Sequence, residues 1–297
     1  MQAHPTDEPA IDQLAFDSDR YQRATVPVTI SGQGPYRFFI DTGAQATVVS
    51  HKIVNDLQLQ PSGRARVVAM GSVQEVDTVE LDELRFANRT FNGLTSPLLR
   101  ERNLGADGIL GLDSLQDLRV LIDFQAGTIE VADASLLGGN SGYEIVVRAR
   151  RHLGQMIITN ARINGVRTAV IIDTGAQNSI GNLALRKKLR GRDEEGKLIS
   201  TDVHGVSMQS NLYLAGKLSI GGLELRDVPM GFAASPVFAS LGLEEQPTLI
   251  LGMQNLQIFE RVAIDFANQR VLFDIPGSTY AEDIRKRVFF PTRLETI

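Results

Sequence analysis

The feature of this chain that most constrains its fold is an internal repeat, because a repeated motif indicates duplicated structural units. Residues 39–45 read Phe-Ile-Asp-Thr-Gly-Ala-Gln, and residues 171–177 read Ile-Ile-Asp-Thr-Gly-Ala-Gln. One recurring word of this length could arise by chance. The order of later landmarks therefore decides whether the chain is duplicated.

Two further landmarks recur in the same order. The segment Gly-Ile-Leu-Gly-Leu at 108–112 is echoed by Leu-Ile-Leu-Gly-Met at 249–253. The segment Leu-Ile-Asp-Phe at 121–124 is echoed by Ala-Ile-Asp-Phe at 263–266. A duplication explains three landmarks in the same order, and coincidence does not. The chain therefore has two halves of the same design.

Each half has the residue pattern of β-strands. Residues 24–30 and 36–40 are mostly β-branched or aromatic and are separated by Ser, Gly, Gln and Pro, a turn composition. In the second half, residues 156–163 and 167–172 lie on either side of an Asn-Gly pair, a strong hairpin signal. These patterns predict an all-β protein of two mostly antiparallel lobes, related by a pseudo-twofold axis, with a cleft between the lobes.

Short helices are expected between some strands, at residues 51–57, 113–118, 182–190 and 254–259. The boundary between the halves is expected in the glycine-rich segment 137–142. The predicted division is an N-terminal extension at 1–20, lobes at 21–137 and 138–277, and a C-terminal tail at 278–297. The hydrophobic residues 288–290 of the tail could add a strand, dock in the cleft or engage a partner.

The repeated motif has a physical logic as a turn that carries a carboxylate. An aliphatic strand delivers the Asp, Gly permits a close backbone approach or a positive φ, and the Thr hydroxyl can anchor the turn. In two symmetry-related copies, Asp41 and Asp173 would meet at the axis. Two carboxylates within about 3 Å cannot both ionise freely, so they share one proton. Such a pair can activate a water for attack on an amide, and this chemistry needs no metal, cysteine or cofactor.

These motifs resemble those of the retropepsin-like aspartic proteases, in particular the bacterial single-chain members with two Asp-Thr-Gly-Ala lobes. In that family each lobe also carries two aliphatic residues followed by Gly, and both landmarks occur twice here. The resemblance implies an aspartic endopeptidase whose catalytic residues are Asp41 and Asp173. It also implies that Thr42 and Thr174 hydrogen-bond across the lobe interface. The other residues expected to support the active-site turns are Gly43, Ala44, Gly175 and Ala176.

Members of this family close a β-hairpin flap from each lobe over an extended substrate, which binds as an added strand. Segments 69–73 and 203–207 lie at corresponding places in the two halves, and each carries a glycine. They are therefore the candidate flaps, although neither has the Tyr of the pepsin pattern near its tip. The candidate substrate-contacting residues are Met70, Gly71, Ser72, His204, Gly205 and Val206.

The residue after Asp-Thr-Gly bears on the acidity of the aspartate pair. Pepsins usually have Ser or Thr where this chain has Ala44 and Ala176. Loss of that hydroxyl removes a hydrogen bond to the carboxylate, which leaves the pair less acidic. We therefore expect a weakly acidic pH optimum, and a rate maximum well below about pH 3 would contradict this expectation.

Two other interpretations remain open. The fold could serve as a catalytically weak or latent peptide-binding or assembly module, in which closed flaps or a displaced lobe exclude water or substrate. The two matched carboxylates favour an enzyme, since a pure binder has no chemical reason to keep both. Autoprocessing of an N-terminal segment is a further interpretation.

The composition excludes several other classes of protein. The chain of 297 residues has a formal net charge of −5 and no strongly basic run, so nucleic acid and anionic membranes are not expected partners. It has no Cys, and its 4 His lack metal-ligand spacing, so no metal site and no cofactor are expected. No apolar run approaches the roughly 20 residues of a membrane-spanning helix. The expected partner is a protein or peptide substrate.

Both lobes lie in one chain, so a monomer is expected to be active. The polar residues 1–9 are not a signal peptide, but bacterial relatives commonly carry one, so the resemblance implies a periplasmic or otherwise exported protein. Asp123 and Asp265 also recur in the repeat, but each precedes a turn and is predicted to be structural.

Overall fold

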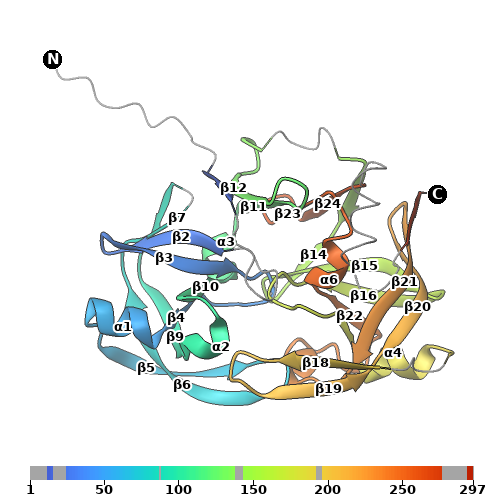
Figure 1. The fold of residues 1–297 in the computed structure, drawn as a ribbon, viewed down its shortest axis with the longest axis horizontal. Helices are drawn as coiled ribbons and strands as arrows, with labels where there is room; N and C mark the ends of the chain where they lie inside the picture. Colours follow the sequence, from blue (N-terminus) through green and yellow to red (C-terminus); the bar gives the residue numbers. More distant parts are fainter. Residues whose placement is uncertain are drawn as a thin grey trace.

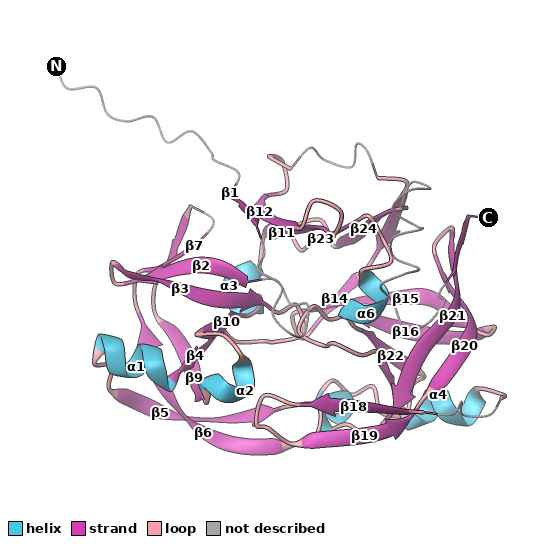
Figure 2. Cartoon of the chain, in the orientation of Figure 1, coloured by secondary structure: helices cyan, strands magenta, loops and turns pink. Residues whose placement is uncertain are grey.

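The computed structural model describes residues 12–15, 25–86, 88–137, 143–191, 196–275 and 293–296. Strands dominate this part of the chain, and its helices have four to seven residues (Figure 2). The predicted all-β class with two lobes is confirmed. The helices are α1 His51–Leu57, α2 Glu101–Leu104, α3 Leu112–Leu115, α4 Leu183–Lys188, α5 Pro236–Ser240 and α6 Met253–Leu256.

Four of the six helices in the described residues were predicted from the sequence, but only one of them has the predicted ends. The helix expected at 51–57 has these bounds, and the one expected at 182–190 is shorter at both ends. α3 and α6 each begin one residue earlier than expected and end three residues earlier. α2 and α5 were not predicted, because a single helical turn leaves too little periodicity in a sequence.

The first half of the chain forms a nine-stranded sheet in the order β5-β6-β9-β4-β10-β3-β2-β7-β8 (Figure 1). Its strands are β2 Thr25–Ile30, β3 Gln33–Ile40, β4 Val48–Ser50, β5 Pro61–Val68, β6 Val73–Leu81, β7 Leu84–Phe86, β8 Arg89–Phe91, β9 Leu94–Leu99 and β10 Gly108–Leu110. β2 and β3 form the hairpin that the sequence predicts, with a shorter turn than expected. The core face of this sheet is aliphatic and aromatic.

The second half forms an eight-stranded sheet in the order β14-β15-β16-β22-β17-β21-β20, with β25 paired to β21, and a separate hairpin β18–β19. Its strands are β14 Arg150–His152, β15 Gln155–Ile163, β16 Val166–Ile172, β17 Ile180–Gly181, β18 Lys197–Thr201, β19 Ser207–Asn211, β20 Tyr213–Ile220, β21 Leu223–Phe232, β22 Thr248–Leu251 and β25 Arg293–Thr296. β25 belongs to the predicted tail, so part of the tail adds a strand. Residues 288–290 lie outside the described residues.

The centres of the two lobe sheets have the same pairing. In the first lobe β3 pairs with β10 in parallel, β10 with β4 antiparallel and β4 with β9 in parallel. In the second lobe β16, β22, β17 and β21 repeat these three pairings in the same order. The strand before each Asp-Thr-Gly therefore lies beside the strand that ends at the aliphatic-Gly landmark. Strands buried on both faces read as continuous apolar runs, as these do.

A third sheet joins the lobes. It has the order β1-β12-β11-β23-β24-β13, with β1 Asp12–Ala15, β11 Leu118–Asp123, β12 Thr128–Asp133, β13 Ile145–Arg148, β23 Arg261–Asp265 and β24 Arg270–Asp274. At its centre β11 and β23 pair antiparallel, with Arg119 opposite Asp265 and Asp123 opposite Arg261. This symmetric register places the third repeated landmark across the pseudo-twofold axis. Residues 138–142 of the predicted boundary segment 137–142 lie outside the described residues.

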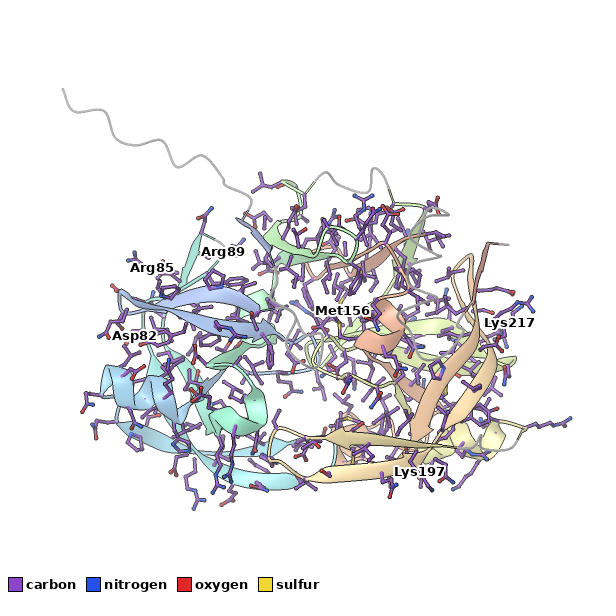
Figure 3. The ribbon with its side chains drawn as sticks, viewed as in Figure 1. Asp82, Arg85, Arg89, Met156, Lys197 and Lys217 are labelled. Atoms are coloured by element: carbon purple, nitrogen blue, oxygen red, sulfur yellow. The ribbon has the colours of Figure 1, made fainter. Side chains whose placement is uncertain are left out.

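The two recurring aspartates of this sheet serve in turns, as predicted. Asp123 Oδ1 accepts from Ala126 N at 2.7 Å, and Asp265 Oδ1 accepts from Asn268 N at 2.9 Å. Asp265 also forms a buried ion pair with Arg119, which the sequence analysis missed. By contrast, Arg85 of β7 and Lys217 of β20 are exposed at the outer edges of their lobes (Figure 3).

Candidate active site

Both motif aspartates lie at the end of a central pair of parallel strands. β3 ends just before Asp41, and the Asp41 N–H donates to Leu110 O at 3.1 Å, where β10 ends. β16 ends just before Asp173, and the Asp173 N–H donates to Leu251 O at 3.1 Å, where β22 ends. The strands are anchored by buried aliphatic residues. Each lobe thus delivers one carboxylate from a rigid core to the lobe interface.

Each carboxylate is held by backbone N–H groups of its own turn. Asp41 Oδ1 accepts from Gly43 N at 2.8 Å and from Ala44 N at 3.1 Å. The second turn has the same two hydrogen bonds to Asp173 Oδ1, at 2.9 and 3.0 Å. These bonds fix one oxygen of each carboxylate, and they favour the ionised form because they donate to it.

The glycine of each turn is required by the carboxylate of the opposite turn. A Cβ built on Gly43 would lie 2.6 Å from Asp173 Cγ, and one built on Gly175 would lie 2.3 Å from Asp41 Oδ2. Carbon atoms do not approach this closely without displacing their neighbours, so a larger residue does not fit at either position. The glycines therefore serve a close approach and not a positive φ. The structure brings the two aspartates together, each over the backbone of the opposite lobe.

The two threonines form the hydrogen bonds that were expected across the lobe interface. Thr42 Oγ1 accepts from Thr174 N at 3.2 Å and donates to Ile172 O at 2.9 Å. Thr174 Oγ1 accepts from Thr42 N at 3.1 Å and donates to Ile40 O at 2.7 Å. Both side chains are buried. This reciprocal set ties each turn to the strand of the other lobe and fixes the separation of the aspartates.

The electrostatics of the pair follow from its burial and from its two like charges. Burial raises the pKa of Asp173 well above the usual range of a carboxyl, and the negative charge of Asp41 raises it further. The backbone N–H donors of the turn oppose this rise without cancelling it. The two aspartates therefore keep one proton between them at a pH where isolated carboxyls are ionised. Both residues remain partly exposed, so water can reach them.

The second landmark recurs because it supports the first. A Cβ on Gly111 would lie 2.4 Å from the carbonyl carbon of Ala46, and one on Gly252 would lie 2.7 Å from Asn178 O. Only glycine lets the loop after each Asp pack so closely on the following helix, α3 or α6. The first residue of each helix then donates its N–H to the alanine carbonyl of the turn, at 2.9 and 2.8 Å.

A pair of hydroxyl side chains that supports the two turns was not predicted from the sequence. Thr47 and Ser179 each follow their Asp by the same number of residues, and their hydroxyls accept from Gly111 N at 3.2 Å and Gly252 N at 3.0 Å. Both are buried. Their matching positions in the two copies are the signal that could have identified them.

The two candidate flap tips meet each other. The hairpins β5–β6 and β18–β19 run along the same side of the molecule (Figure 1), and the predicted segments lie at their tips. Ser72 Oγ donates to Asp202 Oδ2 at 2.5 Å and lies 2.7 Å from His204 Nδ1. The Gly71 N–H also donates to Asp202 Oδ2, at 3.3 Å. Asp202 is buried, and it was not among the predicted flap residues.

Each flap tip packs on the lobe opposite to its own. Met70 packs on an apolar cluster of the second lobe that also contacts Ala176, a residue of the second dyad turn. Val203 packs on an apolar cluster of the first lobe that also contacts Ala44. The flaps therefore close on the side of the molecule where the aspartates lie. Of the other two predicted flap residues, Gly205 lies against the Asn103 side chain and Val206 is exposed.

His204 has one nitrogen without a partner. Because Ser72 Oγ donates to Asp202, the Nδ1 of His204 is the donor to Ser72 Oγ. Its Nε2 is buried and has no hydrogen-bond partner among the described residues. Burial lowers the pKa of His204, although the charge of Asp202 opposes this effect. Contact between the flap tips therefore favours the neutral imidazole.

The described residues contain no group of three or more His, Cys, Asp or Glu side chains that could hold a metal ion. No helix in the described ranges is long and apolar enough to span a bilayer.

The comparison with known families gives one match for each half. Residues 26–117 match the family "gag-polyprotein putative aspartyl protease", and residues 159–254 match the family "Aspartyl protease". Each matched range contains one Asp-Thr-Gly-Ala motif and one aliphatic-Gly landmark. No curated protein matches the chain.

Proposed function

Since the chain belongs to the retropepsin-like aspartic protease family, with both lobes in a single chain, we propose that it is an aspartic endopeptidase. It hydrolyses peptide bonds in extended segments of other proteins, as a monomer, with a water activated between Asp41 and Asp173. The observation that supports this most is the reciprocal approach of the two carboxylates over Gly43 and Gly175. A surface that only binds peptides would not require two carboxylates of like charge to lie so close together.

The proposed mechanism follows from the single proton that the two aspartates share. In the reacting state Asp173 holds this proton, in keeping with its raised pKa, and Asp41 is the ionised partner. Asp41 takes a proton from the bound water as the water oxygen attacks the amide carbon, while Asp173 gives its proton to the carbonyl oxygen. The resulting diol collapses when Asp41 protonates the amide nitrogen, Asp173 takes back a proton from a hydroxyl, and the carbon–nitrogen bond breaks.

A latent form is the second candidate function, and the contact of the flap tips favours it. Substrate entry requires the hydrogen bonds from Ser72 and Gly71 to Asp202 to break. A protein held in this closed state would bind or cleave little until a partner or a change of conditions opened the flaps.

The test is cleavage of a diverse peptide library between pH 3 and 8 by the wild type, Asp41→Asn and Asp173→Asn. We expect cleavage by the wild type alone, blocked by a pepstatin-like transition-state mimic. Wild-type rates in either variant would overturn the proposal. A third outcome is that none of the three proteins cleaves, although all are folded and Asp41→Asn binds peptides. The protein is then a binding module or a latent protease.

A further inference from the structure

Gln155 of the second lobe reaches into the active-site turn of the first lobe. It begins β15 directly after a tight turn in which Leu153 and Gly154 have φ of 48° and 85°. This turn crosses the lobe interface, because Leu153 O accepts from Gln45 Nε2 at 3.3 Å. The next residue, Met156, is buried, and its label in Figure 3 shows the reader where this part of β15 lies. The Gln155 side chain is only 4% exposed.

The buried amide of Gln155 has a specific partner. Its Nε2 donates to Gly43 O at 2.5 Å. The Gly43 carbonyl and the Ala44 N–H belong to one peptide unit, and this N–H donates to Asp41 Oδ1 at 3.1 Å. Gln155, the peptide unit and Asp41 thus form a chain of hydrogen bonds that starts in one lobe and ends at the carboxylate of the other.

This chain affects both the position and the charge of Asp41. A hydrogen bond to a peptide carbonyl polarises the peptide and strengthens donation by its N–H. Stronger donation to a carboxylate favours its ionised form.

We infer that Gln155 is a positioning residue, which orients the Gly43–Ala44 peptide under Asp41 and favours the ionised form of Asp41. The other charged or titratable groups on the elements packed against this turn are Asp113 on α3, which accepts from Thr47, and Arg151 and His152 on β14. The inference rests on the proposed function only for its consequence in catalysis.

The test uses Gln155→Met, which keeps the volume and removes the donor. Because Asp41 would ionise less readily, the acid limb of kcat/KM should move to higher pH by roughly half a unit to one unit. At the acid side of the optimum this shift corresponds to a loss of about threefold to tenfold, with KM little changed. In Gln155→Glu, the introduced carboxyl can donate to Gly43 O only when protonated, so its deficit should grow as pH rises.

The matched control is Arg151→Gln. Arg151 lies in the same hairpin and also crosses to the first lobe, where its Nη2 donates to Gln116 Oε1 at 3.1 Å. Arg151→Gln should leave the acid limb in place. If Gln155 had a purely structural role, Gln155→Met and Gln155→Glu would lower kcat by the same factor at every pH, without a shift of the acid limb. This result would overturn the inference.

A second measurement separates the inference from the proposed function. Carboxyl carbon NMR titration of the wild type and Gln155→Met follows the aspartate pair without any turnover, with assignment by Asp41→Asn and Asp173→Asn. The lower apparent pKa of the pair should be higher in Gln155→Met. An unchanged lower pKa would refute the inference even in an active protease, and a raised one would support it even if no peptide is cleaved.

Discussion

At the residue scale, the glycines of the two Asp-Thr-Gly turns carry the tightest constraint. Each has the carboxylate of the opposite lobe where its Cβ would stand, so the motif of one lobe is shaped by the other lobe. A sequence shows that Gly43 and Gly175 recur, but it does not show which atom excludes their side chains. Only the packed pair of lobes supplies that atom.

Gly175→Ala tests this constraint. Its methyl group would overlap Asp41 Oδ2, so the pair must separate or rotate, and we expect a loss of kcat of about 100-fold or more. The control is Gly222→Ala, because a Cβ at Gly222 would meet nothing within 4 Å and its φ is not positive. Steady-state kinetics on one peptide, with circular dichroism to check folding, compare the two. Equal activity in both variants would contradict the close approach.

The shared proton predicts how stability depends on pH. The pKa of Asp173 is raised in the folded state, so the folded protein binds more protons than the unfolded chain between the two pKa values. The resulting stability is present below the unfolded pKa and is lost as pH rises through the folded one. Asp173→Asn removes this loss.

The difference in Tm between Asp173→Asn and the wild type should therefore grow in favour of the variant from pH 4 to pH 8. Thermal unfolding across this range measures it. A difference that stays constant with pH would show that folding does not raise the pKa of Asp173.

At the residue scale, the sequence predicted the site residues that are identical in the two copies of the motif, but not the side chains outside the motif that support it. Asp41, Asp173 and the two threonines were identified because both copies carry them. Gln155 was not, because its partner Gly43 lies in the other lobe and no sequence pattern links the two.

At the element scale, the two flap hairpins hold each other closed. Ser72 Oγ bonds to Asp202 across the tips, whereas Asp202 also accepts from His204 N and Val206 N within its own turn. Removal of Ser72 therefore loosens the contact between the hairpins and leaves the second turn intact. The positions of both tips could be predicted from glycine and spacing, but their mutual contact depends on how the lobes face each other.

Ser72→Ala should increase amide hydrogen exchange at residues 69–72 and 202–206, because the open state becomes more populated. We expect a threefold to tenfold increase, of the order of one hydrogen bond of about 1 kcal/mol. Ser62→Ala, near the base of the same hairpin, removes an exposed hydrogen bond to Glu80 and should leave the tips unchanged. Unchanged exchange in Ser72→Ala would mean that the Gly71 hydrogen bond to Asp202 and the apolar contacts of Met70 and Val203 hold the flaps closed without Ser72.

At the scale of the whole molecule, the six-stranded sheet fixes the lobes relative to each other. Its centre contains the ion pair of Arg119 and Asp265, with a distance of 2.5 Å between Arg119 Nη2 and Asp265 Oδ2. Burial alone would raise the pKa of Asp265, but hydrogen bonds from Arg119 and Asn268 outweigh it and lower the pKa below its usual value. This contribution to stability is present above the unfolded pKa and is lost as pH falls.

Arg119→Met leaves the Asp265 charge buried without its main partner and should lower the free energy of unfolding by roughly 3–5 kcal/mol. The double variant Arg119→Met with Asp265→Leu should recover part of this loss. Arg89→Gln removes an exposed ion pair with Asp133 and should cost about 1 kcal/mol or less. Urea unfolding measures all three. Similar costs for Arg119→Met and Arg89→Gln would contradict a central role for the buried pair.

The joining sheet was not predicted. The recurrence of residues 121–124 at 263–266 indicated only a duplication, although both aspartates were correctly expected in turns. The antiparallel pairing of β11 and β23 across the axis was not foreseen, because pairing between distant strands depends on the packing of whole lobes. β1 and β25 were likewise assigned to an extension and a tail, since four residues carry too little pattern.

The central claim is that one pair of carboxylates, assembled from both halves, hydrolyses peptide bonds. The most direct measurement is the cleavage rate of a single good peptide substrate at weakly acidic pH by the wild type and by Asp41→Asn. We predict that the variant folds, binds the peptide and loses at least about 1000-fold in kcat. Cleavage by Asp41→Asn at a rate close to that of the wild type would contradict the claim.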